Sequence, residues 1–392
     1  MSITNWHFLL RGKFMKKSAL KKLVAVLASA GLMLLALAPT PASANQTIRL
    51  YIGADTNVKD LWEKALLPEF YKAYPDYNVE ITYDRNGQND AQTLAKVVAS
   101  KATRKDPGMD VIDGGMTVQL GGAGLLWRGT PGLLPNLRNV PQVLIKNGKG
   151  GIPYRASLVL LAYNSKNVKT PPKTLAELLA WAKANPGKFT YNAPSGGGSG
   201  FAFVQTVLDT NLTKKEIETL VTVPNKTLQA KWEKGFETLR ELNKFTYGQN
   251  GTYPVNNAAT LDLLSKGLVD MGPVWSDQIA SALKAGTMPK DIKTTTISNP
   301  SFTGGPAFLG IPNNSPNRNA ARVLVNWVLS PAAQNIIVTG VMNGLPVIPV
   351  ELLDPTAAAS IGAVDITTLR PGYLNSNATD LRSAWASKVP GK

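Results

Sequence analysis

The sequence contains no cysteine, and its single histidine, His7, lies near the first residue. The chain beyond residue 44 therefore has neither residue type. Without them it cannot form a Ser-His-Asp or Cys-His nucleophile. It also lacks the imidazole and thiolate ligands of the usual zinc, copper or haem sites. Disulfides are excluded too, but a chain of this length can bury a sufficient core without them.

Long apolar runs are scarce as well. The most prominent, Leu23–Ala38, has sixteen residues, which is shorter than the roughly 20 residues of a membrane-spanning helix. Four lysines precede it, and small residues and prolines follow it up to Ala44. This succession is typical of a secretory signal peptide. We expect cleavage after Ala44 and export to the periplasm, with Met15 a better-placed start than Met1.

The charge of the chain is basic but dispersed. There are 42 Lys and Arg against 26 Asp and Glu, a formal net charge of +16. Residues 1–44 hold six of the basic residues and no acidic one, so +10 remains after cleavage. Basic residues beyond residue 44 form no run longer than two and often stand beside acidic ones. We therefore expect a solvated surface rather than nucleic-acid binding, with an anionic ligand or an acidic docking partner as the alternative.

Strand and helix patterns alternate in the first part of the expected mature chain. Apolar runs at 47–52 and 110–113 and the alternation at 77–83 predict strands. Apolar residues at helical spacing predict helices over 59–74 and 89–101. This order indicates a parallel sheet covered by helices. Similar alternation restarts near residue 155. The further strands are expected over 151–164, 189–191, 271–274, 292–297 and 307–311, and the further helices over 174–184, 201–210, 213–221, 229–243, 257–266, 319–329 and 332–339.

Two polar turns follow expected strands, where open parallel sheets place their ligands. Asp55, Thr56 and Asn57 follow the first strand, and Gly115 and Met116 follow the third. Permissive glycines and small polar side chains suit a ligand there. The alternative is that these are ordinary strand–helix turns and helix caps.

A glycine-rich turn precedes the helix expected at 201–210. It contains Ser195, Gly197 and Ser199. Free backbone N–H groups at a helix start favour an anionic or strongly accepting group. No Gly-Lys-Ser/Thr follows, so the turn is not a P-loop. The alternative interpretation is a flexible connection.

Three larger side chains complete the candidate site. Trp275, followed closely by Asp277, stands between a strand and a helix, where its ring could stack on a sugar or aliphatic ligand. Tyr154 and Arg155 open the second α/β unit, and Arg155 could pair bidentately with a carboxylate or phosphate. The alternatives are interdomain packing for Trp275 and a structural ion pair for Arg155.

Two other functions, hydrolysis by a serine–lysine pair and ferric binding by tyrosines, can be assessed from the sequence. Ser281 and Lys284 match the S-x-x-K pattern of serine–lysine hydrolases, but no K-T-G follows. Ferric binding by phenolates needs neighbouring tyrosines, and the chain has no Tyr-Tyr pair.

Several motifs occur in one order along the chain. They are the Gly-x-Asp loop after the first strand, PGMDVIDGG at 107–115, GIPY at 151–154 with Tyr163-Asn164, PPKTLAEL at 171–178, LSKGLVDMGP at 264–273, and NAAR at 319–322 with LSPAAQ at 329–334. This set resembles the family 1 extracellular solute-binding proteins of bacterial ABC importers, which include maltose-, polyamine- and iron-binding members. The likeness covers nearly all of residues 47–350.

The resemblance implies an α/β, type II periplasmic-binding-protein fold. Each of two lobes would hold a mainly parallel sheet flanked by helices, with crossing strands as the hinge and the ligand in the cleft. Lobe 1 would take residues 45–155 with 293–330, and lobe 2 would take 156–292 with 331–392. Relatives place ligand contacts at positions matching Asp55, Thr56, Gly115, Met116, Tyr154, Ser195 and Trp275.

The implied function is binding, not catalysis, and requires no cofactor or metal. The protein would capture a small polar solute, either a sugar or polyol or an organic phosphate or carboxylate. It would work as a monomer and deliver the solute to an inner-membrane ABC permease. A serine–lysine hydrolase using Ser281 and Lys284, or a ferric- or anion-binding member of the same fold, are the alternatives.

Overall fold

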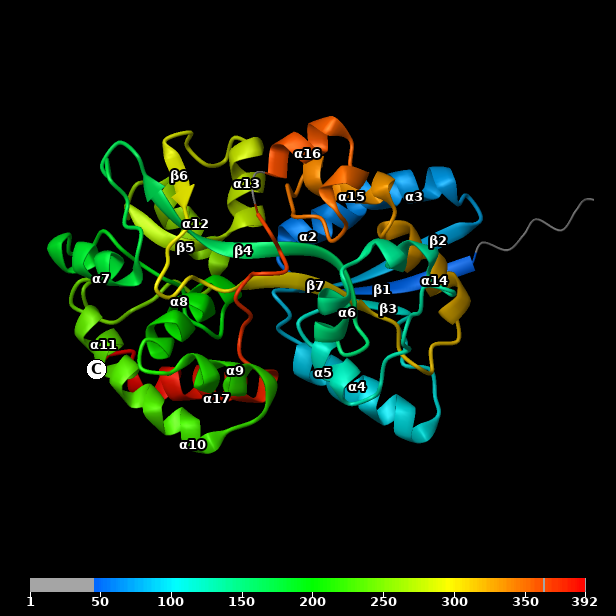
Figure 1. Ribbon diagram of the computed structural model, residues 1–392, viewed down its shortest axis with the longest axis horizontal. Coiled ribbons are helices and arrows are strands. Elements are labelled where there is room, and N and C mark those ends of the chain that lie inside the picture. Colours follow the sequence, from blue (N-terminus) through cyan, green and yellow to red (C-terminus); the bar gives the residue numbers. More distant parts are fainter. Residues whose placement is uncertain (1–45, 362–363, 392) are drawn as a thin grey trace, which may run out of the picture. The chain divides into compact units, whose positions relative to one another are not determined.

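The computed structural model describes residues 46–361 and 364–391 (Figure 1). The expected signal peptide, its cleavage after Ala44 and the choice between Met1 and Met15 lie outside the described residues. Within the described residues, every helix is too short or too polar to cross a membrane.

The first strands and helices alternate as predicted. β1 (Gln46–Ala54) pairs in parallel with β2 (Tyr77–Arg85) on one side and with β3 (Val111–Gly114) on the other. The helix expected over 59–74 is present as α2 (Thr56–Asp60), a π-helical turn η1 (Leu61–Leu66) and α3 (Leu67–Ala73), and the next helix is α4 (Asp90–Thr103). Because apolar side chains of β1 and η1 are buried on the same side, local periodicity was enough to predict this unit.

The rest of the sheet is antiparallel, so the expectation of a mainly parallel sheet is correct for the strands of the first lobe and wrong for those of the second. Its strands are β4 (Ile152–Asn164), β5 (Met271–Trp275), β6 (Ile292–Thr295) and β7 (Gly304–Gly310). The strand order is β2-β1-β3-β7-β4-β5, with β6 also paired to β4. β7 runs antiparallel to both β3 and β4, and β4 runs antiparallel to β5 and β6. Residues 189–191 form no strand; Phe189 makes isolated bridges only.

Helices cover the strands along most of the chain. They are α5 (Thr117–Gly122), η2 (Pro135–Asn139), α6 (Gln142–Asn147), α7 (Leu175–Ala184), α8 (Gly198–Asp209), α9 (Lys214–Thr222), α10 (Lys226–Gln229), η3 (Ala230–Trp232), α11 (Glu233–Leu242), α12 (Asn257–Ser265), α13 (Ser276–Lys284), α14 (Arg318–Val328), α15 (Pro331–Thr339), η4 (Val350–Leu352), α16 (Pro355–Ile361) and α17 (Asn375–Lys388). The sequence did not predict α17, because the polar Asn377 occupies one of its buried positions and obscures the helical period.

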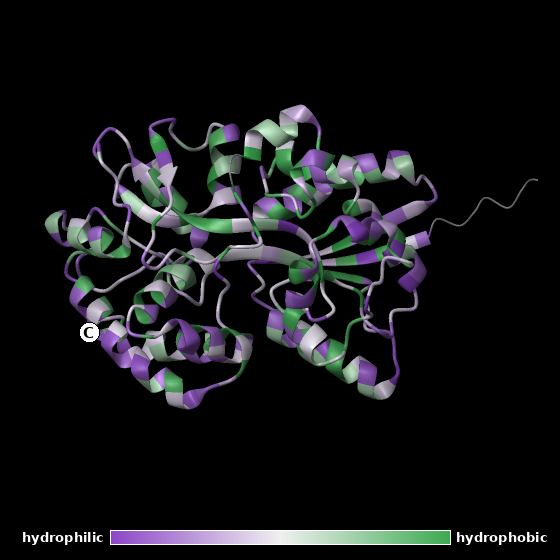
Figure 2. Ribbon diagram, viewed as in Figure 1, coloured by the Kyte–Doolittle hydropathy of each residue, from purple (hydrophilic) through white to green (hydrophobic). Residues whose placement is uncertain are grey.

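Two large hydrophobic cores organise these elements. The first contains Ile48 of β1, Trp62 of η1 and Leu324 of α14. The second contains Phe203 of α8 and Trp385 of α17. Figure 2 shows apolar residues concentrated along the inner strands and polar residues on outer helices such as α10 and α11.

Some segments pack in a different half of the molecule from the lobe in which we expected them. Residues of α15 and α16, which we expected in lobe 2, pack in the first core, since α15 lies against η1. Ile297 and Phe302, expected in lobe 1, pack in the second core. In the described part of the chain, β4, β7 and the segment 364–374 pass between the cores. The first half of β4, from Ile152 to Leu158, pairs with β7, so these two strands form a ribbon shared by both halves (Figure 1).

Candidate ligand-binding site

A cavity of about 310 Å³ lies where β1 ends, between elements of the two cores. Asp55, Asn57 and Gly115 line it from the side of the first core. Trp275 and Asp277 line it from the side of the second. Further lining residues come from the turn Gly196–Gly198, from Asn257 and Gln278, and from Arg155, Ser157 and Gly305–Ala307 of the crossing strands.

Hydrogen bonds connect the two sides of this cavity directly. Asn57 Nδ2 donates to Asp277 Oδ2 over 3.2 Å, and Asn257 Nδ2 donates to Asp55 Oδ2 over 3.0 Å. Asp55 is the N-cap residue of α2, but its side chain accepts no capping hydrogen bond there. Its carboxylate is therefore directed across the cavity to Asn257 instead of to its own helix.

Arg155 is the cationic residue of the cavity and is itself buried. Its Nε donates to Tyr154 Oη over 2.7 Å, and Tyr154 Oη donates to Asp113 Oδ2 over 2.5 Å. Asp113 also accepts a hydrogen bond from Trp62 Nε1 at 2.9 Å. Arg155 Nη1 lies 3.7 Å from Asp277 Oδ2. This chain of contacts fixes the guanidinium beside the carboxylate.

The titration of these groups follows from burial and from neighbouring charges. Burial raises the pKa of Asp55, and the hydrogen bond from Asn257 opposes that rise. Burial also raises the pKa of Asp277, where the charge of Arg155 opposes it. Burial by itself lowers the pKa of Arg155, but Tyr154, Asp113 and Asp277 together raise it further, so Arg155 stays charged.

The glycine-rich turn is already capped from within the chain. Ser199 N donates to Asn257 Oδ1 over 3.3 Å, and Gly200 N donates to Asn192 Oδ1 over 3.0 Å. Ser199 Oγ lies 2.8 Å from both amide oxygens. Two of the first N–H groups of α8 therefore have acceptors, which leaves the turn less suited to an anion than the sequence suggested.

Seven of the predicted site residues line the cavity. They are Asp55, Asn57, Gly115, Arg155, Gly197, Trp275 and Asp277. The other five are not among its lining residues: Thr56 and Ser195 are exposed, and Met116, Tyr154 and Ser199 are buried. Sequence reasoning missed Asn257 and Gln278, since neither a motif nor a period marks them. The only local signal for Asn257 is its place directly after Asn256, which caps α12.

Ser281 and Lys284 serve contacts between α13 and the end of α15. Ser281 Oγ donates to the carbonyl of Asp277 at 2.8 Å and also lies 3.2 Å from that of Met342. Lys284 Nζ donates to the carbonyls of Thr339 and Gly340 at 2.6 and 2.8 Å. A cation suits the C-terminal end of a helix. These contacts give the S-x-x-K match a structural explanation.

Within 46–361 and 364–391, no three His, Cys, Asp or Glu side chains gather in a way that could hold a metal ion.

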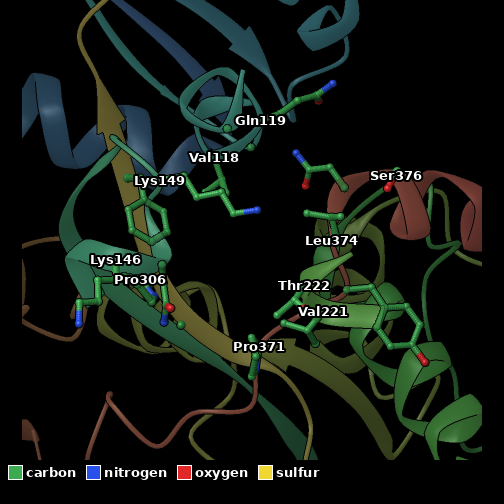
Figure 3. A pocket seen from close by; sticks show the side chains of 18 of the residues that line it. Val118, Gln119, Lys146, Lys149, Val221, Thr222, Pro306, Pro371, Leu374 and Ser376 are labelled. Carbon is green, nitrogen blue, oxygen red and sulfur yellow. The ribbon is translucent and has the colours of Figure 1, made fainter. Parts of the chain in front are cut away.

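A larger cavity of about 730 Å³ adjoins the first and shares Gly115, Gly305 and Pro306 with it. In Figure 3, Val118, Gln119 and Lys149 lie on one side, and Thr222, Leu374 and Ser376 face them from α9 and the start of α17. The two cavities are therefore neighbours along the crossing strands.

Two α/β halves, crossing strands and a cavity between them define the architecture of a solute-binding protein. Residues 65–362 match the family model described as bacterial extracellular solute-binding protein. The chain belongs to this family. A comparison with curated proteins gave no match.

Solved structures share the fold at low sequence identity. An ABC transporter substrate-binding protein from Bradyrhizobium japonicum is 17% identical with a TM-score of 0.63, covering 88% of this chain and 99% of that one. The apo ferric ion-binding protein A of Pasteurella haemolytica is 13% identical with a TM-score of 0.61, covering 88% and 95%. The periplasmic binding protein AfuA of Actinobacillus pleuropneumoniae, with fructose-6-phosphate bound, is 15% identical with a TM-score of 0.61, covering 88% and 98%.

Proposed function

We propose that this protein captures a small polar solute in the cavity between its two cores and delivers it to an inner-membrane ABC permease. The observation that carries the proposal is the cavity itself, which Asp55 and Asn57 line from one side and Trp275 and Asp277 from the other. Family membership and the likeness to a substrate-binding protein of an ABC transporter support it. The protein would act as a periplasmic monomer after cleavage following Ala44, and it would change no covalent bond of the solute.

The proposed mechanism is hinge closure about the ribbon of β4 and β7. The core memberships suggest one lobe of residues 46–156 with 305–361 and 364–366, and a second lobe of residues 157–303 with 370–391. A solute that contacts both lobes favours the arrangement in which they approach. Reversing a 1:99 population to 99:1 requires a preference of about 5.5 kcal/mol for the closed form. Several hydrogen bonds and one aromatic face can supply this amount.

The solute class follows from the lining. A sugar or polyol would use the face of Trp275 with the side-chain oxygens and amides of Asp55, Asn57 and Asp277. An organic phosphate or carboxylate would use Arg155. One related structure is a ferric ion-binding protein and another has fructose-6-phosphate bound. The relatives therefore do not distinguish between these solute classes.

A thermal-shift screen tests the proposal. Sugars, polyols, amines and organic phosphates are added to the purified protein, and a ligand at a hundredfold excess over its Kd should stabilise it by about 2.7 kcal/mol. Trp275→Ala should lose most of that shift, because the ring forms one wall of the cavity. Trp127→Ala, at a partly buried tryptophan of the first core, is the matched control and should keep it.

Two results would overturn the proposal. One is the lack of stabilisation by every class of compound. The other is ester or β-lactam hydrolysis that disappears in Ser281→Ala, which would favour the serine–lysine alternative.

A further inference from the structure

Three acceptor oxygens on residues that line the smaller cavity have no hydrogen-bond partner among the described residues. They are Asn57 Oδ1, Asp277 Oδ1 and Gln278 Oε1, all buried. Asp277 is 4% exposed and Gln278 is 8% exposed, and all three residues line the cavity. A buried acceptor without a partner costs about 1–3 kcal/mol. The cavity is therefore built to receive hydrogen-bond donors.

The orientations of two of these oxygens are fixed by other contacts. Asn57 Nδ2 donates to Asp277 Oδ2, so the amide oxygen of Asn57 is the atom left without a partner. Asp277 Oδ2 accepts that hydrogen bond and lies beside Arg155 Nη1, so Oδ1 is the carboxylate oxygen left without a partner.

The charges of the cavity favour a cationic donor. Its ionisable lining residues are Asp55, Asp277 and Arg155, two carboxylates against one guanidinium. Arg155 is also held from behind by Tyr154 and, through it, by the buried Asp113. A cation placed beside Trp275 can also interact with the face of its indole ring. A neutral polyol would satisfy the acceptors but would leave the excess negative charge uncompensated.

The larger cavity has the opposite character. Its charged lining residues are Lys146 and Lys149, and no acidic residue occurs among its described lining residues. Figure 3 shows the Lys149 side chain on the wall formed with Val118 and Gln119. Apolar groups of Val118, Val221 and Phe308 also line this space. A second ammonium group would be repelled here, whereas an alkyl chain ending in an anion would be accommodated.

Resting on the proposed function, we propose that the solute is an amino acid whose ammonium and anionic groups lie at opposite ends. The ammonium group is held by Asn57, Asp277 and Gln278 in the smaller cavity, since its three N–H donors match three acceptors. The chain then passes Gly115 and Gly305, which both cavities share, and the carboxylate, sulfonate or phosphonate end lies near Lys149.

Calorimetry with matched probes tests this inference. 5-Aminopentanoate is compared with pentanoate, 5-hydroxypentanoate, 1,5-diaminopentane and norvaline, with shorter and longer ω-amino acids as a length series. We expect one member of the ω-amino acid series to bind at least tenfold more tightly than every analogue that lacks one charged end group, that carries two ammonium groups, or that carries both charged groups on the same carbon. Equal or tighter binding of the diamine, the hydroxy acid or norvaline would overturn the inference.

Variants assign the two ends of the ligand. Asp277→Asn keeps the size of the side chain and should weaken the preferred ω-amino acid at least tenfold, while Asp291→Asn, at an exposed ion pair with Lys166, should not. Lys149→Gln should weaken the ω-amino acid but leave pentylamine unchanged, with Lys183→Gln as its control. Circular dichroism and thermal melting establish that each variant is folded. Unchanged affinity in folded Asp277→Asn would overturn the inference, as would equal weakening of both ligands in Lys149→Gln.

Failure of the inference can be distinguished from failure of the proposed function. Binding of sugars or organic phosphates with no binding of ω-amino acids would overturn the inference and leave the proposed function standing. No binding by any compound class would overturn both.

Discussion

Tyr154 is a residue that affects the cavity without lining it, because it positions Arg155. Tyr154 matches a ligand-contact position of relatives, yet it is fully buried and contacts Arg155 and Asp113. The register of β4 with β7 shifts between Pro153 and Arg155, which leaves Tyr154 outside the regular pairing. Sequence could identify the pair Tyr154-Arg155 as polar residues on a strand, but only the tertiary structure shows which of the two reaches the cavity.

Asp90 is a residue whose charge state should be visible in stability. Tyr51 Oη donates to Asp84 Oδ2 at 2.7 Å and lies 3.2 Å from Asp90 Oδ1. Burial and the charge of Asp84 raise the pKa of Asp90 to about 6, although the hydrogen bond with Tyr51 opposes the rise. The corresponding pKa in the unfolded chain is about 3.9. Protonation of Asp90 therefore stabilises the folded protein. This contribution to the free energy of unfolding is fully present below about pH 4 and is lost as the pH rises through 6.

We predict that Asp90→Asn increases the free energy of unfolding, relative to the wild type, by more at pH 7.5 than at pH 4.5. The difference between the two pH values should be on the order of 1 kcal/mol, because the site is partly exposed and solvent screens the charges. Urea denaturation at pH 4.5, 6.0 and 7.5 measures it, with Asp262→Asn, at an exposed pair with Lys266, as the control. The same effect at all three pH values would contradict the prediction.

At the scale of elements, the start of α8 depends on close packing rather than on ligand approach. A Cβ atom at Gly198 would stand 2.5 Å from Cζ2 of Trp275, which real Cβ atoms do not do. The turn therefore needs glycine so that α8 can begin against the indole ring. The sequence pattern of glycines was correct in marking a special turn, but its physical reason is the neighbouring tryptophan.

Gly198→Ala should accordingly displace Trp275. We expect it to reduce the free energy of unfolding by about 1–3 kcal/mol, as overpacking usually does, and to change the tryptophan fluorescence. Gly132→Ala is the control, since the nearest atom to a Cβ there, Thr130 Oγ1, is 3.9 Å away. Denaturation followed by fluorescence distinguishes the two, and equal stability of both variants would refute the packing role of Gly198.

Local patterns predicted elements better than their partners. The helix expected over 174–184 is present as α7, and the capping box of Thr174 and Glu177 at its start has both reciprocal hydrogen bonds. By contrast, the apolar runs of β4 and β5 say nothing about direction, because a buried strand has the same composition in parallel and antiparallel pairs. Likewise, the helical period of α15 revealed that one face is buried, but not that η1 would cover it.

At the scale of the whole molecule, contacts away from the cavity also connect the two halves. α13 packs with β4 and β5, whereas α15 belongs to the first core. Lys284 Nζ joins them by donating to the carbonyls of Thr339 and Gly340. These contacts help to hold the two halves together independently of any solute.

Removing this contact should shift the balance between open and closed forms. A hydrogen bond to a charged group contributes about 1.5–3 kcal/mol at most, and Lys284 is exposed, so we expect Lys284→Ala to shift the equilibrium by less than about tenfold. Small-angle scattering without solute should give a larger radius of gyration for this variant. Lys266→Ala, whose partner Asp262 is on its own helix, is the control. A radius no larger than that of the control would contradict the prediction.

Arg155 lines the cavity and also belongs to β4, the strand that leads from one core into the other. Any rotation of one half against the other twists the peptide units that carry its guanidinium. If the proposed function is correct, solute contact at Arg155 and hinge closure are coupled, and we expect a mutation that stiffens β4 to change both the binding and the release of the solute.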